Sequence, residues 1–145
     1  MIKVGPAGSD GLGNLKGVEK VAAMGLDCME VAFTYGVRMD LKTAEAVGAL
    51  AKEKGIILSA HAPYYVNLAS EEKDKLIASR QRILDSCEKA DAMGAQNVIF
   101  HAGFYQNRTV TQTYHLIKKE IVGLQDYVCK KSWKVRLCPD RKSVV

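Results

Sequence analysis

Two of the three histidines in the sequence close short apolar runs, and these are the residue types best suited to metal chemistry. His61 ends one run and His101 ends another, while Asp140 follows a third. Imidazole and carboxylate groups are the ligands that zinc, manganese and iron take from proteins. The three residues therefore predict a metal site, with purely structural histidines as the alternative.

The segments that must position these residues alternate between strand and helix patterns. Strands are predicted at 2–6, 28–33, 56–61, 96–101 and 133–138, and helices at 14–24, 41–54, 71–93 and 109–129. Three helical patterns end in Gly25, Gly55 or Gly94, because glycine takes the left-handed conformation past a helix end without steric cost. The strands are nearly continuous apolar runs, which suits parallel strands covered on both faces. The alternation predicts an α/β fold.

The helices are expected to be amphipathic. Asp40 and Ser70 are the predicted N-cap residues of the helices at 41–54 and 71–93. Apolar residues recur at helical spacing and predict the buried faces. They are Leu15, Val18 and Val21 in the first helix, Leu41, Ala44, Val47 and Ala51 in the second, and Leu76, Ile83, Leu84, Cys87 and Ala90 in the third.

The order amounts to four and a half strand–helix units. A TIM (β/α)8 barrel needs about 250 residues, so the chain of 145 predicts the N-terminal half of such a barrel. We expect the partial barrel at 1–138 and an atypical basic tail at 139–145. A complete doubly wound sheet is the alternative. In both architectures ligands gather at the carboxyl ends of the strands, and neighbouring strands lie about 4.8 Å apart. His61 and His101 are therefore expected to meet at one metal ion or to flank two.

Other candidate residues have less support. His115 falls in a helix without a matched partner and is expected at the surface or in packing. Glu30 lies inside a predicted strand, from which it could point into the barrel. The glycine-rich segment 5–13 matches neither a dinucleotide fingerprint nor a P-loop, so we expect a flexible loop at the barrel mouth, with phosphate binding as the alternative. The four cysteines form no C-x-x-C pair and predict reduced, mostly buried thiols.

The net charge of +5 comes entirely from the last sixteen residues, since residues 1–129 hold 15 basic and 15 acidic side chains. A terminal basic cluster either binds phosphate or is merely solvated. No apolar run approaches the roughly 18 residues of a membrane span, and the N-terminus lacks the apolar core of a secretory signal. We therefore expect a cytoplasmic protein that makes no membrane contact.

Three segments resemble motifs of the endonuclease IV family of apurinic/apyrimidinic endonucleases. Residues 61–68 read His-Ala-Pro-Tyr-Tyr-Val-Asn-Leu and resemble the family's third-strand motif. Residues 101–103, His-Ala-Gly, are similar to its fourth-strand His-Pro-Gly motif, with Ala102 in place of proline. Residues 33–38, Phe-Thr-Tyr-Gly-Val-Arg, are similar to the second-strand loop that carries a DNA-contacting arginine.

This resemblance implies half of a xylose isomerase-like TIM barrel that cleaves double-stranded DNA on the 5′ side of abasic sites, with a trinuclear zinc centre. His61 and His101 would be zinc ligands, with Mn²⁺ as the alternative metal. Arg38, Tyr64 and Tyr65 would bind DNA beside the flipped-out nucleotide. Such chemistry is sound, because zinc-bound water has a pKa of about 7 and clustered metals stabilise the attacking and leaving oxygens of a phosphate displacement.

The fifth predicted strand departs from the family pattern. The family's strand ends in Pro-Glu, and this glutamate bridges metals, whereas here the corresponding pair is Pro139 and Asp140. We expect Asp140 to act as metal ligand and catalytic carboxylate, although its side chain is one methylene shorter. The ligands of later strands are missing, so inactivity through truncation is one expectation.

Two further alternatives stay open. One is a sugar isomerase or epimerase of the same superfamily, which also binds a divalent metal through strand-end histidines and carboxylates. The other is a non-catalytic fragment that binds metal or DNA. Because a half barrel leaves strand edges unpaired, we also expect a homodimer that closes the barrel through these edges.

Overall fold

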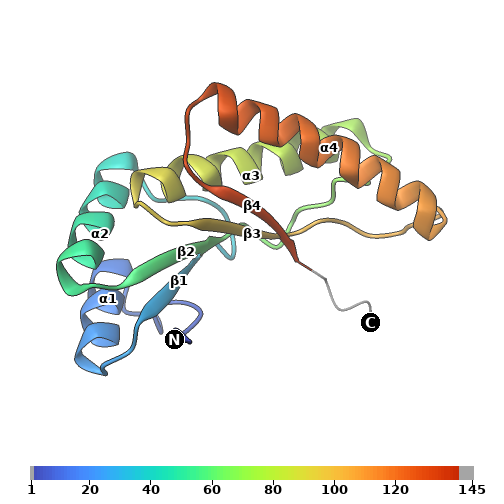
Figure 1. The fold of residues 1–145 in the computed structure, drawn as a ribbon. Helices are drawn as coiled ribbons and strands as arrows, with labels where there is room; N and C mark the ends of the chain where they lie inside the picture. The colour runs from blue at the N-terminus through green and yellow to red at the C-terminus, as the bar shows by residue number, and fades with distance from the viewer. Residues whose placement is uncertain (1, 141–145) are drawn as a thin grey trace.

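The computed structural model describes residues 2–140, which form a four-stranded parallel sheet with a helix before each strand. The sheet order is β1-β2-β3-β4. Figure 1 shows the helices on one side of the twisted sheet and no helix on the other. This is the arrangement of half a TIM barrel and confirms the predicted fold class. In chain order the elements are α1 (Asn14–Ala23), β1 (Cys28–Ala32), α2 (Leu41–Lys54), β2 (Ile57–His61), α3 (Lys73–Ala92), β3 (Asn97–His101), α4 (Val110–Lys130) and β4 (Arg136–Asp140).

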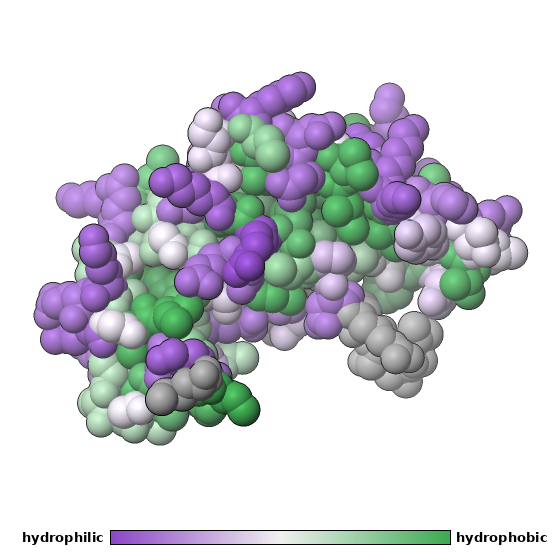
Figure 2. Space-filling view, viewed as in Figure 1, coloured by the Kyte–Doolittle hydropathy of each residue, from purple (hydrophilic) through white to green (hydrophobic). Residues whose placement is uncertain are grey.

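The hydrophobic core lies between the sheet and the helices. Successive side chains of a strand point to opposite faces, and the buried ones all face the helices. Hydrophilic side chains project from the outer surface, and hydrophobic ones are visible between and beneath them (Figure 2). The strands contribute Met29, Val31, Leu58, Ala60, Val98 and Phe100 to this core, and the helices contribute Val18, Val21, Ala44, Val47, Ala51, Ile83, Cys87, Ala90, Leu124 and Val128.

The second helix matches its prediction in both ends and cap. Asp40 accepts a hydrogen bond from Thr43 N at 2.7 Å, and Gly55 ends the helix in the left-handed conformation. The prediction for the third helix was wrong at its start, because α3 begins at Lys73 with Glu72 as N-cap residue. The Ser70 hydroxyl instead accepts from Glu72 N at 3.3 Å and so shapes the preceding turn.

Two predicted strands differ from the structure. Residues 2–6 form no named strand, although Val4 O accepts from Asp27 N just before β1 and Pro6 O accepts from Glu30 N within it. Ala7 makes a single parallel bridge to Glu30. Pro6 has no amide hydrogen to donate. At the other end of the sheet, β4 starts at Arg136 rather than at 133. Trp133 N donates to Val128 O, and Lys134 N donates to the Asp91 carboxylate. These two bonds hold the turn that follows α4.

The predicted apolar faces are largely confirmed. Leu15 and Leu41 are exceptions, with 41% and 45% of their surface exposed. All four cysteines are free thiols, as predicted, but only Cys87 is fully buried. Burial raises the pKa of the Cys87 thiol to about 12, so this group is a protonated packing residue rather than a nucleophile.

Two further expectations concern the basic tail at 139–145 and contact with a membrane. Arg141 and Lys142 of the expected basic tail lie outside the described residues, whereas Pro139 and Asp140 are part of β4. None of the helices within residues 2–140 has the length and hydrophobicity to span a bilayer.

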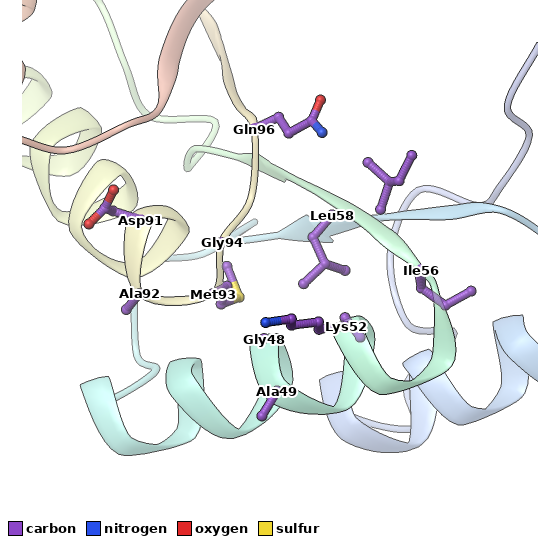
Figure 3. A pocket seen from close by; sticks show the side chains of 12 residues that line it. Gly48, Ala49, Lys52, Ile56, Leu58, Asp91, Ala92, Met93, Gly94 and Gln96 are labelled. Carbon is purple, nitrogen blue, oxygen red and sulfur yellow. The ribbon is translucent and has the colours of Figure 1, made fainter.

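A cavity of about 460 Å³ opens at the amino ends of β2 and β3 (Figure 3). Gly48 of α2 lies on its wall and packs directly against the turn after α3, since a Cβ at this position would stand 2.5 Å from Met93 O. This edge of a barrel is the one that serves stability rather than chemistry. The close approach fixes how α2 packs against the α3–β3 connection.

We expect Gly48→Ala to lower the free energy of unfolding by about 1–3 kcal/mol, because the added methyl group overlaps backbone atoms that cannot move independently. Gly123→Ala is the matched control, since it is also a helical glycine but has nothing within 4 Å of the new Cβ. The control should be stabilised by about 0.5–1 kcal/mol through helix propensity. Urea denaturation of the two variants measures both changes, and equal stability of the two would contradict the packing argument.

Candidate metal centre

The carboxyl ends of β2, β3 and β4 bring His61, His101 and Asp140 together on the face of the sheet that carries no helix. His101 and Asp140 are register partners, and His61 pairs with Ile99, one pleat earlier on β3. One ligand atom from each of the three side chains lies within 4.8 Å of the other two. The predicted convergence of these residues is thus present. Their role as metal ligands stays a prediction.

His61 is oriented so that its Nε2 is available as a metal ligand. Its Nδ1 lies 2.8 Å from Ala62 O, and a carbonyl oxygen only accepts, so Nδ1 carries the hydrogen. In the neutral ring Nε2 then presents its lone pair. Metal-bound histidines usually donate their other ring hydrogen to a backbone carbonyl or carboxylate in this way.

His101 and Asp140 complete the group from the edge of the sheet. His101 Nδ1 lies 4.0 Å from Asp140 Oδ2, and the histidine is mostly buried while the aspartate is half exposed. Ligand atoms on one tetrahedral zinc ion, each at about 2.1 Å, lie about 3.4 Å apart. The three side chains, whose ligand atoms lie within 4.8 Å of one another, therefore need to close by up to about 1.4 Å to share one ion.

Tyr64 covers both imidazoles. Its ring centroid lies 5.8 Å from that of His61 and 5.7 Å from that of His101, and it is stacked on the latter at 14°. The two histidine rings are 5.0 Å apart in an edge-on arrangement. Half of the Tyr64 surface is exposed, so the tyrosine is both a wall of the site and a surface for a ligand.

Asn67 ties together the two loops that follow the histidines. Its Oδ1 accepts from Ala69 N at 3.0 Å and from Phe104 N at 3.3 Å, and the adjacent Leu68 N donates to Ala102 O at 2.9 Å. The backbone N of Asn67 donates to Ser79 Oγ at 3.0 Å, which anchors the loop to α3. The sequence motif pointed to Asn67, but only the structure gives it this positioning role.

A polar cavity of about 380 Å³ adjoins His61. Glu30 points into it from β1, and the glycine-rich segment around residues 7–11 forms the opposite wall. Sequence reasoning considered Glu30 and this segment separately and did not predict that they face each other. No spacing signal joins them, because the loop folds back through left-handed residues that include Asp10.

The other sequence candidates lie near this edge or away from it. Arg38 is exposed on the loop after β1, and Tyr65 is 63% exposed on the loop after β2. DNA binding by Arg38, Tyr64 and Tyr65 stays a prediction. His115 is exposed on α4 against the Tyr114 ring, in agreement with the surface position expected for it.

We expect His61→Ala and His101→Ala each to weaken Zn²⁺ binding by more than about 100-fold, which exceeds the effect of changing groups that merely orient ligands. His115→Ala is the matched control and should bind zinc as the unmodified chain does. Titration of Zn²⁺ against a competing chelator measures these affinities. Equal affinities in all three variants would show that the metal binds elsewhere.

We expect Asn67→Ala to weaken Zn²⁺ binding by about tenfold, since the loop that carries His101 loses its tether. Asn67→Asp retains an oxygen that accepts from the same two amides and should restore most of the affinity. The same chelator competition measures both variants. A loss of affinity that Asn67→Asp fails to restore would argue against positioning through this oxygen.

Comparison with known proteins places this geometry in a family. The family described as "Xylose isomerase-like TIM barrel" matches residues 18–138. The uncharacterized protein MJ0133 of Methanocaldococcus jannaschii is 35% identical over 127 residues, which cover 86% of this chain and 45% of the relative.

Solved structures share the fold. A D-psicose 3-epimerase crystallised with D-fructose superimposes with a TM-score of 0.72 at 21% identity, over 89% of this chain and 47% of the epimerase. Endonuclease IV from Thermus thermophilus superimposes with a TM-score of 0.69 at 22% identity, over 91% of this chain and 49% of the nuclease. The chain thus spans about half the length of the proteins that it matches. It belongs to the xylose isomerase-like TIM barrel family.

Proposed function

We propose that the chain is the metal-binding half of a barrel that isomerises or epimerises a small sugar. The observation that carries this proposal is the meeting of His61, His101 and Asp140 beside a polar cavity. The cavity volume of about 380 Å³ falls in the range of small-molecule sites. The similarity to a D-psicose 3-epimerase supports this substrate class.

The residues of the chain have separate roles in this proposal. His61 binds the metal through Nε2 while Ala62 O holds its ring, and His101 and Asp140 bind from the neighbouring strands. Tyr64 shields one side of the two imidazoles from water. A bound Zn²⁺ or Mn²⁺ would polarise the hydroxyl and carbonyl oxygens of the sugar as a Lewis acid.

Endonuclease IV-like cleavage of abasic DNA is the second candidate. The observation in its favour is the exposed pair Tyr64 and Tyr65 beside the histidines, because aromatic side chains stack on unpaired bases. The similarity to endonuclease IV from Thermus thermophilus supports the same candidate. Duplex DNA with an abasic site is its substrate, and zinc is its metal.

Either activity draws on more of the barrel than residues 2–140 supply, because the four strands form an open sheet whose edge strands are β1 and β4. A second copy of the chain that pairs along these edges is the partner we propose. Residues 4–8 already bond along part of β1, so β4 is the more accessible edge.

Two parallel assays, one of the Mn²⁺-loaded chain and one of the Zn²⁺-loaded chain, separate the two candidates. We expect D-fructose to displace water from the bound Mn²⁺ and so to lower the water-proton relaxation rate, because the sugar hydroxyls replace water as ligands. His61→Ala should abolish this response and His115→Ala should keep it. In parallel, a labelled duplex with one abasic-site analogue should stay intact with Zn²⁺. Metal-dependent cleavage 5′ to the lesion that the His61→Ala, His101→Ala double variant loses would overturn the sugar assignment in favour of the nuclease.

A further inference from the structure

The polar cavity beside His61 is built from three separate segments. Ala7–Gly11 and Asn14 form one wall, the end of β1 and its loop form another, and His61 with Tyr64 forms the third. A ligand in this cavity therefore reaches a candidate metal ligand and the glycine-rich loop at once. The charges of the residues that line the cavity determine whether it favours a neutral or a charged ligand.

Among the described residues, Glu30 is the one lining carboxylate without a compensating charge. Its backbone is fixed from both sides, since its N donates to Pro6 O at 3.0 Å and its O accepts from Gly8 N at 2.8 Å. Its side chain takes no hydrogen bond or ion pair from a residue within 2–140. The half-buried carboxylate thus presents its acceptor oxygens to the cavity.

Asp10, the other acidic residue of the wall, is already neutralised. Lys20 Nζ lies 2.7 Å from Asp10 Oδ2, and this hydrogen bond holds the pKa of the Asp10 carboxyl below its ordinary value. The remaining polar lining consists of the Ser9 and Thr34 hydroxyls, the Asn14 amide, His61 and Tyr64. No lysine or arginine from the described part of the chain lines the cavity.

We infer that this cavity binds an unphosphorylated polyhydroxy group and that Glu30 makes it reject a phosphate. This inference rests on the proposed function and deepens it by naming the substrate class. Sugar hydroxyls donate to a carboxylate, which accepts several hydrogen bonds and strengthens each of them through its charge. A phosphate dianion offers only acceptors to Glu30 and finds no lysine or arginine of residues 2–140 in the wall.

One feature of the wall acts in the opposite direction. The first turn of α1, where Asn14 lies, has neither an acidic residue nor a side-chain cap, and the positive end of a helix attracts anions. This attraction corresponds to about half an elementary charge, whereas Glu30 contributes a full negative charge. The balance favours a neutral ligand, and replacing Glu30 by an uncharged residue should reverse it.

The test compares D-fructose with D-fructose 6-phosphate by calorimetric titration of the metal-free chain, because a Zn²⁺ ion at His61 would itself attract the phosphate. We expect the unmodified chain to bind fructose at least about tenfold more tightly, as one charge-assisted hydrogen bond is worth that factor. Glu30→Gln should weaken fructose binding by about tenfold and bring the phosphate ester to equal or tighter binding. Glu45→Gln removes one exposed carboxylate on α2 and should leave the preference unchanged.

Each outcome bears on a separate statement. Equal or tighter binding of the phosphate ester by the unmodified chain, an unchanged preference in Glu30→Gln, or no binding of either sugar overturns the inference. Titration with Zn²⁺ alone tests the metal centre, so a chain that prefers fructose but binds no zinc would contradict the proposed function and leave the sugar site standing. Thermal unfolding of Glu30→Gln at the temperature of the unmodified chain establishes that a lost preference is local.

Discussion

The parallel pairing of the four neighbouring strands, β1 with β2, β2 with β3 and β3 with β4, is the constraint on which the candidate site depends. All four strands run the same way, so their carboxyl ends reach one edge of the sheet. The ladder continues past the named strands, because Phe33 N donates to His61 O at 2.9 Å and Ala62 N donates to Ile99 O at 2.8 Å. Each strand end is therefore tied to the next one along. The histidine rings stand 5.0 Å apart because the backbone beneath them is hydrogen-bonded in this register.

The same pairing explains which parts of the site the sequence could predict. His61, His101 and Asp140 each end an apolar run, and period-2 alternation with parallel pairing is sufficient to bring them together. Glu30 faces the same side by the same alternation, yet its partner wall is a loop with left-handed residues, whose path no periodicity encodes. Asn67 is a similar case, since its role depends on the conformation of two loops. Strand-borne groups were thus predictable, and groups that act across loops were not.

The boundaries that failed have local causes. Residues 2–6 have the composition of a strand, but Gly5 lies so close to Cys28 O that an added Cβ would overlap it, and Pro6 has no amide hydrogen. At 133–135 the apolar pattern is real, since Trp133 packs against the core and Val135 is buried. The Trp133 amide nevertheless bonds Val128 O at the end of α4 and the Lys134 amide bonds the Asp91 carboxylate of α3, so the ladder begins only at Arg136. Hydrophobicity identified which residues are packed and not which of them pair.

The face without helices is neither uniformly apolar nor uniformly polar, and this bears on what can cover it. Glu30 is paired in register with Ser59, and Asn97 with Arg136, so polar side chains cross the sheet at the level below the histidines. Such a surface tolerates water better than the buried interior of a closed barrel would. A second half barrel that covers it would have to satisfy these polar groups, because a buried carboxylate or guanidinium without a partner is costly. Complementary charges are thus a stricter requirement than hydrophobic area for any second half barrel that covers this face.

Tyr64 separates two environments that suit different ligands. On one side lies the cavity with Glu30, which holds no lysine or arginine of the described chain. On the other side a groove of about 490 Å³ is lined by Tyr65, Phe104, Lys75 and Arg82. Both cationic side chains already make a hydrogen bond within the chain, since Lys75 donates to Glu72 at 2.5 Å and Arg82 donates to Tyr65 O at 2.8 Å. A nucleic acid would need the aromatic groove and would have to keep its phosphates away from Glu30. A sugar needs only the cavity and the histidines. The charges that line the cavity therefore suit the proposed sugar better than a nucleic acid.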